Sequence, residues 1–98
     1  IRSRERVKAL LLSECRDYIL KELRKTRSKR IRKDVLEAKA CKFVVKVSRE
    51  IGNILKITHL PVSLTVVEEA LQQLVEEGLI MISGNYVALT AKFKSKHS

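Results

Sequence analysis

Residues 63–90, SLTVVEEALQQLVEEGLIMISGNYVALT, constrain the fold more than any other part of the chain. Apolar residues first recur at helical spacing, and Gly78 then provides the left-handed conformation that commonly ends a helix. Two short apolar segments, LIMIS and YVALT, flank Gly84-Asn85, and glycine at the first central position suits a type II′ turn. The segment therefore predicts a helix followed directly by a β-hairpin.

The helix in this segment is expected to start at Ser63 or Thr65. The residues T-V-V-E at positions 65–68 match a capping box, in which the threonine hydroxyl and the glutamate carboxylate each accept from a free amide. Its spacing predicts that one face packs on the core, formed by Val67, Ala70, Leu71 and Leu74 with Val75 beside them.

A longer helix is expected at residues 4–25. Its apolar positions recur at helical spacing: Val7, Leu11, Cys15, Tyr18, Ile19 and Leu23. Leu12 and Leu20 widen this stripe beyond the ~100° that a helix packed on one side needs. A second copy of the same helix is the simplest partner for the extra surface, so the sequence predicts a homodimer through residues 1–25.

A second long helix is expected from about residue 30 to residue 55, with Ser28 as its N-cap and a possible break at Gly52. One stripe is predicted to face the core: Leu36, Ala40, Phe43, Val47, Ile51 and Ile54. A separate stripe on the far side is basic: Lys39, Lys42, Lys46 and Arg49. Pro61 prevents a continuous helix, so residues 56–62 are expected to form a turn.

The 98 residues predict a single domain: a helix at 1–25, a basic loop at 26–33, a helical core at 34–78, a wing at 79–90 and a basic tail at 91–98. Charge is unevenly placed along it. Residues 1–50 contain 17 Lys/Arg and 7 Asp/Glu, whereas residues 51–98 contain 4 of each. Such a concentration favours contact with the phosphates of a nucleic acid, although a heavily charged surface without a partner is the alternative.

The proposed phosphate contacts come from the basic segment RKTRSKRIRK and from the basic stripe that follows. The segment contributes Arg24, Lys25, Arg27, Lys29, Arg30, Arg32 and Lys33, and the stripe Lys39, Lys42, Lys46 and Arg49. Lys92 and Lys94 in the tail are further candidates.

The run VSREIGNIL–KITHLPVSL–TVVEEALQQLVEEGLI–MISGNYVALT, about residues 45–90, resembles the winged helix-turn-helix superfamily. The resemblance implies a mainly α fold with a small β-hairpin, a scaffold helix, a recognition helix and a wing, here with an extended N-terminal helix. With its long first helix and basic second helix, the chain looks most like small archaeal or viral DNA-binding members or a ribosomal winged-helix protein. The same frame serves many functions, so the resemblance specifies the fold better than the function.

The helix at residues 63–78 is an unusual reader of bases, because it contains four glutamates and no Lys or Arg. Its uncharged polar residues are the candidates for base contacts: Ser63, Thr65, Gln72 and Gln73. The wing tip, Gly84 and Asn85, is expected near the nucleic-acid backbone. The favoured reading is duplex DNA binding, in transcription regulation, replication or DNA organisation. In a competing reading the basic loop and second helix alone hold phosphates, and double-stranded or ribosomal RNA serves as well as DNA. In a third reading the domain is a protein-interaction adaptor.

The sequence favours no enzyme class, metal or cofactor. It has three glycines and no phosphate-binding glycine loop, and neither His59 nor His97 has a partner that spacing can identify. Cys15 and Cys41 are expected to be buried thiols in a reducing compartment, with an interhelical disulfide as the alternative. No apolar run approaches the ~20 residues of a membrane span. A prokaryotic or viral-host cytoplasm is favoured, although KRIRK also permits nuclear import.

Overall fold

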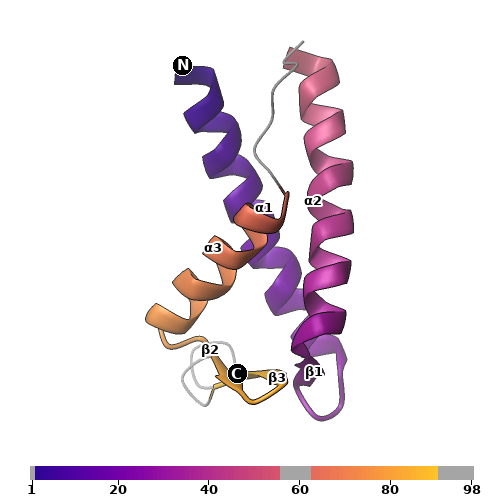
Figure 1. The fold of residues 1–98 in the computed structure, drawn as a ribbon, viewed down its shortest axis with the longest axis vertical. Helices are drawn as coiled ribbons and strands as arrows, with labels where there is room; N and C mark the ends of the chain where they lie inside the picture. Colours follow the sequence, from indigo (N-terminus) through magenta and orange to yellow (C-terminus); the bar gives the residue numbers. More distant parts are fainter. Residues whose placement is uncertain (1, 56–62, 91–98) are drawn as a thin grey trace.

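The computed structural model describes the backbone of residues 2–55 and 63–90 and the side chains of residues 6–54 and 64–90. Its elements are α1 (Arg2–Lys25), β1 (Arg30–Arg32), α2 (Lys33–Leu55), α3 (Ser63–Glu76), β2 (Ile80–Ser83) and β3 (Tyr86–Leu89). The three helices pack against one another and a small sheet lies at one end of them (Figure 1). The fold is therefore mainly helical with a three-stranded antiparallel sheet. The predicted turn at 56–62, with His59 and Pro61, and the tail at 91–98 with Lys92, Lys94 and His97 lie outside the described residues.

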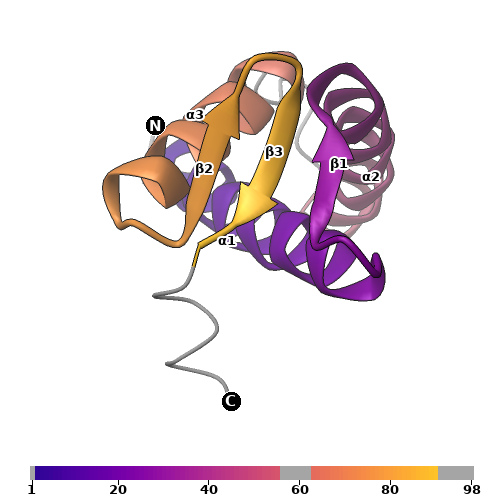
Figure 2. The same cartoon turned by 90° about the horizontal axis from the view of Figure 1, so that it is seen from below.

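The sheet has the strand order β1-β3-β2, so the hairpin of β2 and β3 is extended by a strand from the first half of the chain (Figure 2). The prediction of a loop at 26–33 with a helix from residue 30 was wrong at residues 30–32. Arg30 pairs with Ala88 and Arg32 with Tyr86. The side chain of Ile31 packs against the core, whereas Arg30 and Arg32 are exposed, as expected for a strand of period two.

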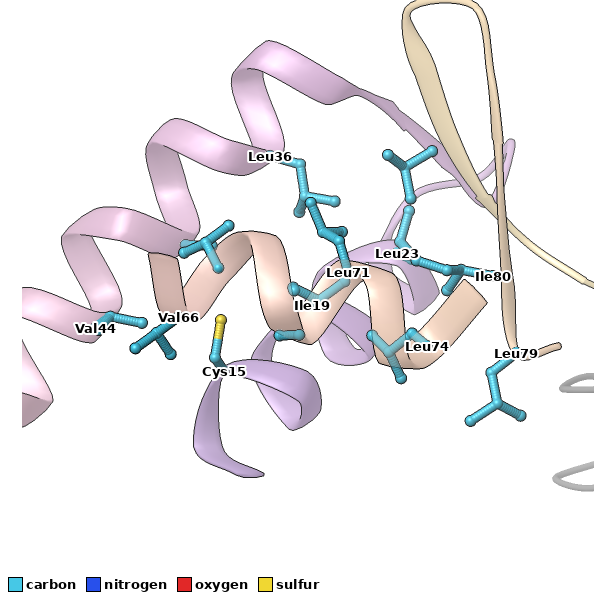
Figure 3. Close-up of a cluster of buried hydrophobic side chains, with 14 of the residues drawn as sticks. Cys15, Ile19, Leu23, Leu36, Val44, Val66, Leu71, Leu74, Leu79 and Ile80 are labelled. Carbon is cyan, nitrogen blue, oxygen red and sulfur yellow. The ribbon is translucent and has the colours of Figure 1, made fainter. Parts of the chain in front are cut away.

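The core confirms the predicted stripe of α1, of which Figure 3 labels Cys15, Ile19 and Leu23. Its fully buried members are Val7, Leu11, Cys15, Ile19 and Leu23, while Leu12, Tyr18 and Leu20 are partly buried against them. Helix α1 packs against both α2 and α3. The two helices of the same chain therefore account for much of the width of its apolar stripe.

The buried face of α2 differs from the predicted one at two positions. Leu36 and Ala40 are fully buried as expected, but Val44 is also buried and was not predicted. Ile54 is 78% exposed, although it lies on the predicted face. Figure 1 shows α1 and α2 spreading apart towards this end, so α1 no longer covers the last part of the apolar stripe of α2. Gly52 is buried and does not break the helix.

Helix α3 begins at Ser63, so Thr65 lies inside its first turn and the predicted capping box was misplaced. Ser28 is not a cap for α2 either, because α2 begins at Lys33 and strand β1 lies between them. The core side of α3 includes Val66 as well as the predicted residues, whereas Val75 is 41% exposed.

The predicted stop of α3 is confirmed. Gly78 has a φ of 76°, and its N–H donates to the carbonyl oxygen of Val75 at 3.0 Å. The N–H of Leu79 donates to the carbonyl oxygen of Leu74 at 3.0 Å, which completes the two bonds of a Schellman motif. The hairpin follows as expected, with Ser83 opposite Tyr86 and a positive φ of 57° at Gly84.

Candidate nucleic-acid interface

The predicted phosphate contacts lie on two consecutive parts of the fold. The end of α1, the connection to β1, β1 itself and the first residue of α2 carry Arg24, Lys25, Arg27, Lys29, Arg30, Arg32 and Lys33. The outer face of α2 carries Lys39, Lys42, Lys46 and Arg49. These eleven residues are called the basic surface below. Nine of them are exposed, and Lys29 and Lys33 are half-buried.

The connection between α1 and β1 is fixed by local hydrogen bonds. The hydroxyl of Thr26 donates to the carbonyl oxygen of Leu23 at 2.9 Å and so satisfies an acceptor in the last turn of α1. Lys29 has a φ of 58°, and its Nζ donates to the carbonyl oxygen of Arg24 at 2.6 Å. Its own carbonyl oxygen accepts from the N–H of Leu89 at 3.0 Å. The basic connection is therefore tied to the sheet.

The two arginines of β1 lie on the solvent face of the sheet together with Tyr86. The guanidinium carbon of Arg30 lies 4.9 Å from the centroid of the Tyr86 ring, which is a cation–π geometry. Arg32 forms an exposed ion pair with Asp34 at 3.3 Å. Sequence reasoning did not place Tyr86 in the site, because only the pairing of β1 with β3 brings these residues together.

The basic stripe of α2 faces away from the core. Its members follow one another at helical spacing, opposite Leu36, Ala40 and Val44. In the part of the chain that the structure describes, the ion pairs are Lys8–Glu69, Arg16–Glu77 and Arg32–Asp34. Of the basic surface, Arg32 alone appears in those pairs. The positive charge of this surface is thus largely uncompensated by neighbouring carboxylates.

The four residues proposed to read bases do not share one surface. Thr65 and Gln72 are exposed and lie seven residues apart, on the same side of α3. Gln73 is half-buried and turned towards α1, where its Oε1 accepts from Nη1 of Arg16 at 3.3 Å. Base contact by Gln73 stays a prediction. The side chain of Ser63 lies outside the described residues.

The glutamates of residues 63–78 divide into two pairs. Glu69 contacts Nζ of Lys8 at 3.4 Å, and Glu77 accepts from Nη2 of Arg16 at 2.6 Å, so both join α3 to α1. Glu68 and Glu76 are exposed, and Glu76 accepts from Nε2 of Gln72 at 3.2 Å. The side of α3 that carries Thr65 and Gln72 therefore also carries carboxylates.

The tip of the hairpin adjoins the basic surface. Gly84 and Asn85 are exposed, and the carbonyl oxygen of Asn85 accepts from the N–H of Lys33 at 2.6 Å. The hairpin turn is thereby held beside Lys33, where β1 ends and α2 begins. A polyanion on the basic surface would pass close to it.

Other chemistry in the described residues is limited. They contain no group of three or more His, Cys, Asp and Glu side chains that could hold a metal ion. Cys15 and Cys41 are thiols rather than a disulfide. Burial raises the pKa of the Cys15 thiol to about 12, and the charge of a neighbouring Cys41 thiolate adds to the shift. No helix in the described ranges is both long and apolar enough to cross a membrane.

No protein-family model, curated protein or solved structure shows a significant match to the chain. A functional assignment therefore rests on the residues described above.

Proposed function

We propose that this chain is a winged-helix domain that binds duplex DNA through its basic surface. The order of elements supports the fold assignment, because a helix, a short strand, two helices and a hairpin follow one another along the chain. The pairing of the first strand with the last also fits a winged-helix sheet. The superfamily includes many nucleic-acid-binding proteins, but the proposal that this chain binds DNA rests on the charges of its basic surface.

The observation that carries the proposal is the concentration of exposed cations on one continuous stretch of chain, residues 24–49. Duplex DNA has one phosphate charge per ~1.7 Å of helix axis, and each contact with Lys or Arg releases condensed counterions. A chain with a net charge of +10 gains affinity from this effect wherever its cations meet the backbone. The outer stripe of α2 has one exposed carboxylate, Glu50, beside its four cations, whereas α3 presents Glu68 and Glu76 and has no Lys or Arg. The stripe of α2 is therefore the better surface for a polyanion.

In this proposal α3 stays outside the major groove and serves mainly to support the core. Its exposed Glu68 and Glu76 flank Thr65 and Gln72, and like charges facing phosphates oppose binding. Contacts are then made mostly to the backbone, which carries no direct sequence information. Such binding suits DNA organisation or replication better than recognition of a single operator.

The test is fluorescence anisotropy with a mixed-sequence DNA duplex and a matched RNA duplex, each titrated at several salt concentrations. Six neutralised phosphates would lower the affinity about a thousandfold between 50 and 200 mM salt. The proposal expects DNA to bind with a steep salt dependence. Tighter binding of RNA would instead favour the ribosomal or RNA-binding alternative, and no binding of either duplex at low salt would contradict the proposal.

A matched pair of variants separates the basic surface from overall charge. The triple variant K42Q/K46Q/R49Q removes three cations from the outer face of α2. The triple variant R6Q/K8Q/K21Q removes the same charge from α1. The first is expected to weaken DNA binding much more than the second. Equal losses would mean that net charge, and not this surface, determines affinity.

A further inference from the structure

A second surface of the molecule has the opposite character to the basic surface. A groove of about 510 Å³ lies between the first turns of α2, one side of α3 and strand β2. Three carboxylates line it, those of Glu37, Glu68 and Glu76, and Lys33 is the one cation among its described lining residues. In a chain of net charge +10, this groove is a locally acidic region.

The groove also exposes apolar side chains that the core does not use. Val75 is 41% exposed and Ile82 is 40% exposed, and both line it together with the buried Leu71. Leu64, 46% exposed, lies seven residues before Leu71 and so extends the same side of α3 by two turns. An apolar strip flanked by charged residues is typical of a surface that binds another protein.

The groove meets the basic surface at Lys33 but lies away from the basic stripe of α2. Glu37 and Lys39 are two residues apart on α2, so their side chains leave the helix on nearly opposite sides. Glu37 faces the groove and Lys39 belongs to the basic stripe. A polyanion on the stripe and a ligand in the groove would therefore occupy different sides of the same helix.

We propose that this acidic groove binds a lysine- and arginine-rich amphipathic helix of a partner protein. Apolar side chains of that helix would cover Leu71, Val75 and Ile82. Its cations would meet the three carboxylates, and this charge complementarity disfavours nucleic acid as the occupant. Glu68 and Glu76 are eight residues apart, or ~12 Å along α3. That distance matches about two turns of a docked helix, which presents apolar anchors at i, i+4 and i+7.

The experiment uses the whole chain and two synthetic 16-residue helical peptides. Both peptides carry leucines at i, i+4 and i+7; one has lysines on its polar face, and the other has glutamates at the same positions. Binding is measured by anisotropy of the labelled peptides. The lysine peptide is expected to bind saturably, and the glutamate peptide is expected not to bind.

Variants of the chain locate the binding. The triple variant E37Q/E68Q/E76Q and the single variant Val75→Ser are each expected to weaken the lysine peptide by about tenfold. The controls are Glu50→Gln, an exposed carboxylate elsewhere on α2, and Met81→Ser, an exposed apolar residue of β2 that does not line the groove. Both controls should leave peptide affinity within about twofold.

Three results would overturn the proposal: no saturable binding of the lysine peptide, equal binding of both peptides, or binding that the groove variants leave unchanged. Duplex DNA is titrated against the same groove variants. Because carboxylates that face phosphates oppose binding, a marked gain of DNA affinity in E37Q/E68Q/E76Q would assign the groove to the nucleic-acid interface instead. Because the peptide assay contains no nucleic acid, its outcome does not depend on whether the chain binds DNA.

Discussion

The backbone N–H of Lys33 donates to the backbone carbonyl oxygen of Asn85, with an N···O distance of 2.6 Å. This bond joins the first residue of α2 to the turn of the hairpin, across 52 positions of sequence. It fixes the hairpin turn beside the junction of β1 and α2. The bond uses main-chain atoms on both sides, so a side-chain substitution leaves it intact and only proline removes the donor.

Replacement of Lys33 by proline tests the contribution of this bond. Proline is well tolerated at the first position of a helix, so α2 itself should not be disturbed. We expect Lys33→Pro to lower the free energy of unfolding by ~1 kcal/mol relative to Lys33→Ala, which keeps the N–H and removes the same charge. Urea denaturation of the two variants measures the difference. Equal stability would show that the bond contributes nothing.

Leu74 and Val75 are neighbours on α3 with different environments. Leu74 is fully buried, whereas Val75 is 41% exposed in the groove. Because a buried leucine leaves a cavity, Leu74→Ala is expected to cost ~2–5 kcal/mol of unfolding free energy. Val75→Ala should cost less than ~1 kcal/mol. Thermal or urea denaturation compares them, and similar losses would place Val75 in the core after all.

The thiol of Cys15 is fully buried and its pKa is raised to about 12. At pH 8 it is therefore almost entirely protonated, and a thiol reagent should modify it only after local or global unfolding. The half-buried Cys41 should react faster in the native protein. The rate of reaction with an aromatic disulfide, compared between Cys15→Ser and Cys41→Ser, measures this. Equally fast reaction of both thiols in the folded chain would contradict the structure.

The same thiol gives stability a dependence on pH. In the folded state Cys15 keeps its proton from its ordinary pKa of 9.0 up to about 12, whereas the unfolded chain loses it. The stabilising contribution is complete below pH 9 and falls as pH rises through this window, by at most ~1.4 kcal/mol per pH unit. Cys15→Ala should show a shallower decline in unfolding free energy between pH 9 and 11 than the unmodified chain. An unchanged slope would assign the decline to other groups.

The homodimer through α1 stays a prediction. Leu10, 46% exposed, is the residue of α1 that it would use, since Leu12 and Leu20 already pack against the core. Sedimentation equilibrium at tens of micromolar is expected to give twice the chain mass, and Leu10→Ser to restore the monomer. A monomeric mass for the unmodified chain would contradict the prediction.

Local patterns predicted the parts of the fold that depend on neighbouring residues. The Gly78 stop, the Gly84-Asn85 turn and the core stripe of α1 all follow from spacing and from the conformational freedom of glycine. Strand β1 could not be found in this way, because Arg30–Arg32 is short, mostly charged and defined by its pairing with β3. A three-residue edge strand leaves little recognisable pattern in the sequence.

The sequence predicted which side of α2 carries the cations of the site, but it predicted less well where individual polar side chains point. The exposed cations of α2 follow from helical periodicity, since positions opposite a buried stripe face solvent. The direction of Gln73 does not, because it depends on Arg16 in a distant helix. Val75 shows the same limit: its place beside the core residues on the wheel does not reveal that a groove lies over it.

The most direct test of the central claim compares two sets of variants on one mixed-sequence DNA duplex, with affinity measured at several salt concentrations. We expect K42Q/K46Q/R49Q to weaken binding and to reduce the slope of log K against log salt by up to ~2.7, or ~0.9 for each lost phosphate contact. The variant T65A/Q72A should keep the slope and stay within about twofold of the original affinity. The opposite pattern, with binding lost in T65A/Q72A and retained in K42Q/K46Q/R49Q, would show that α3 enters the major groove and that the basic surface is not the DNA-binding site.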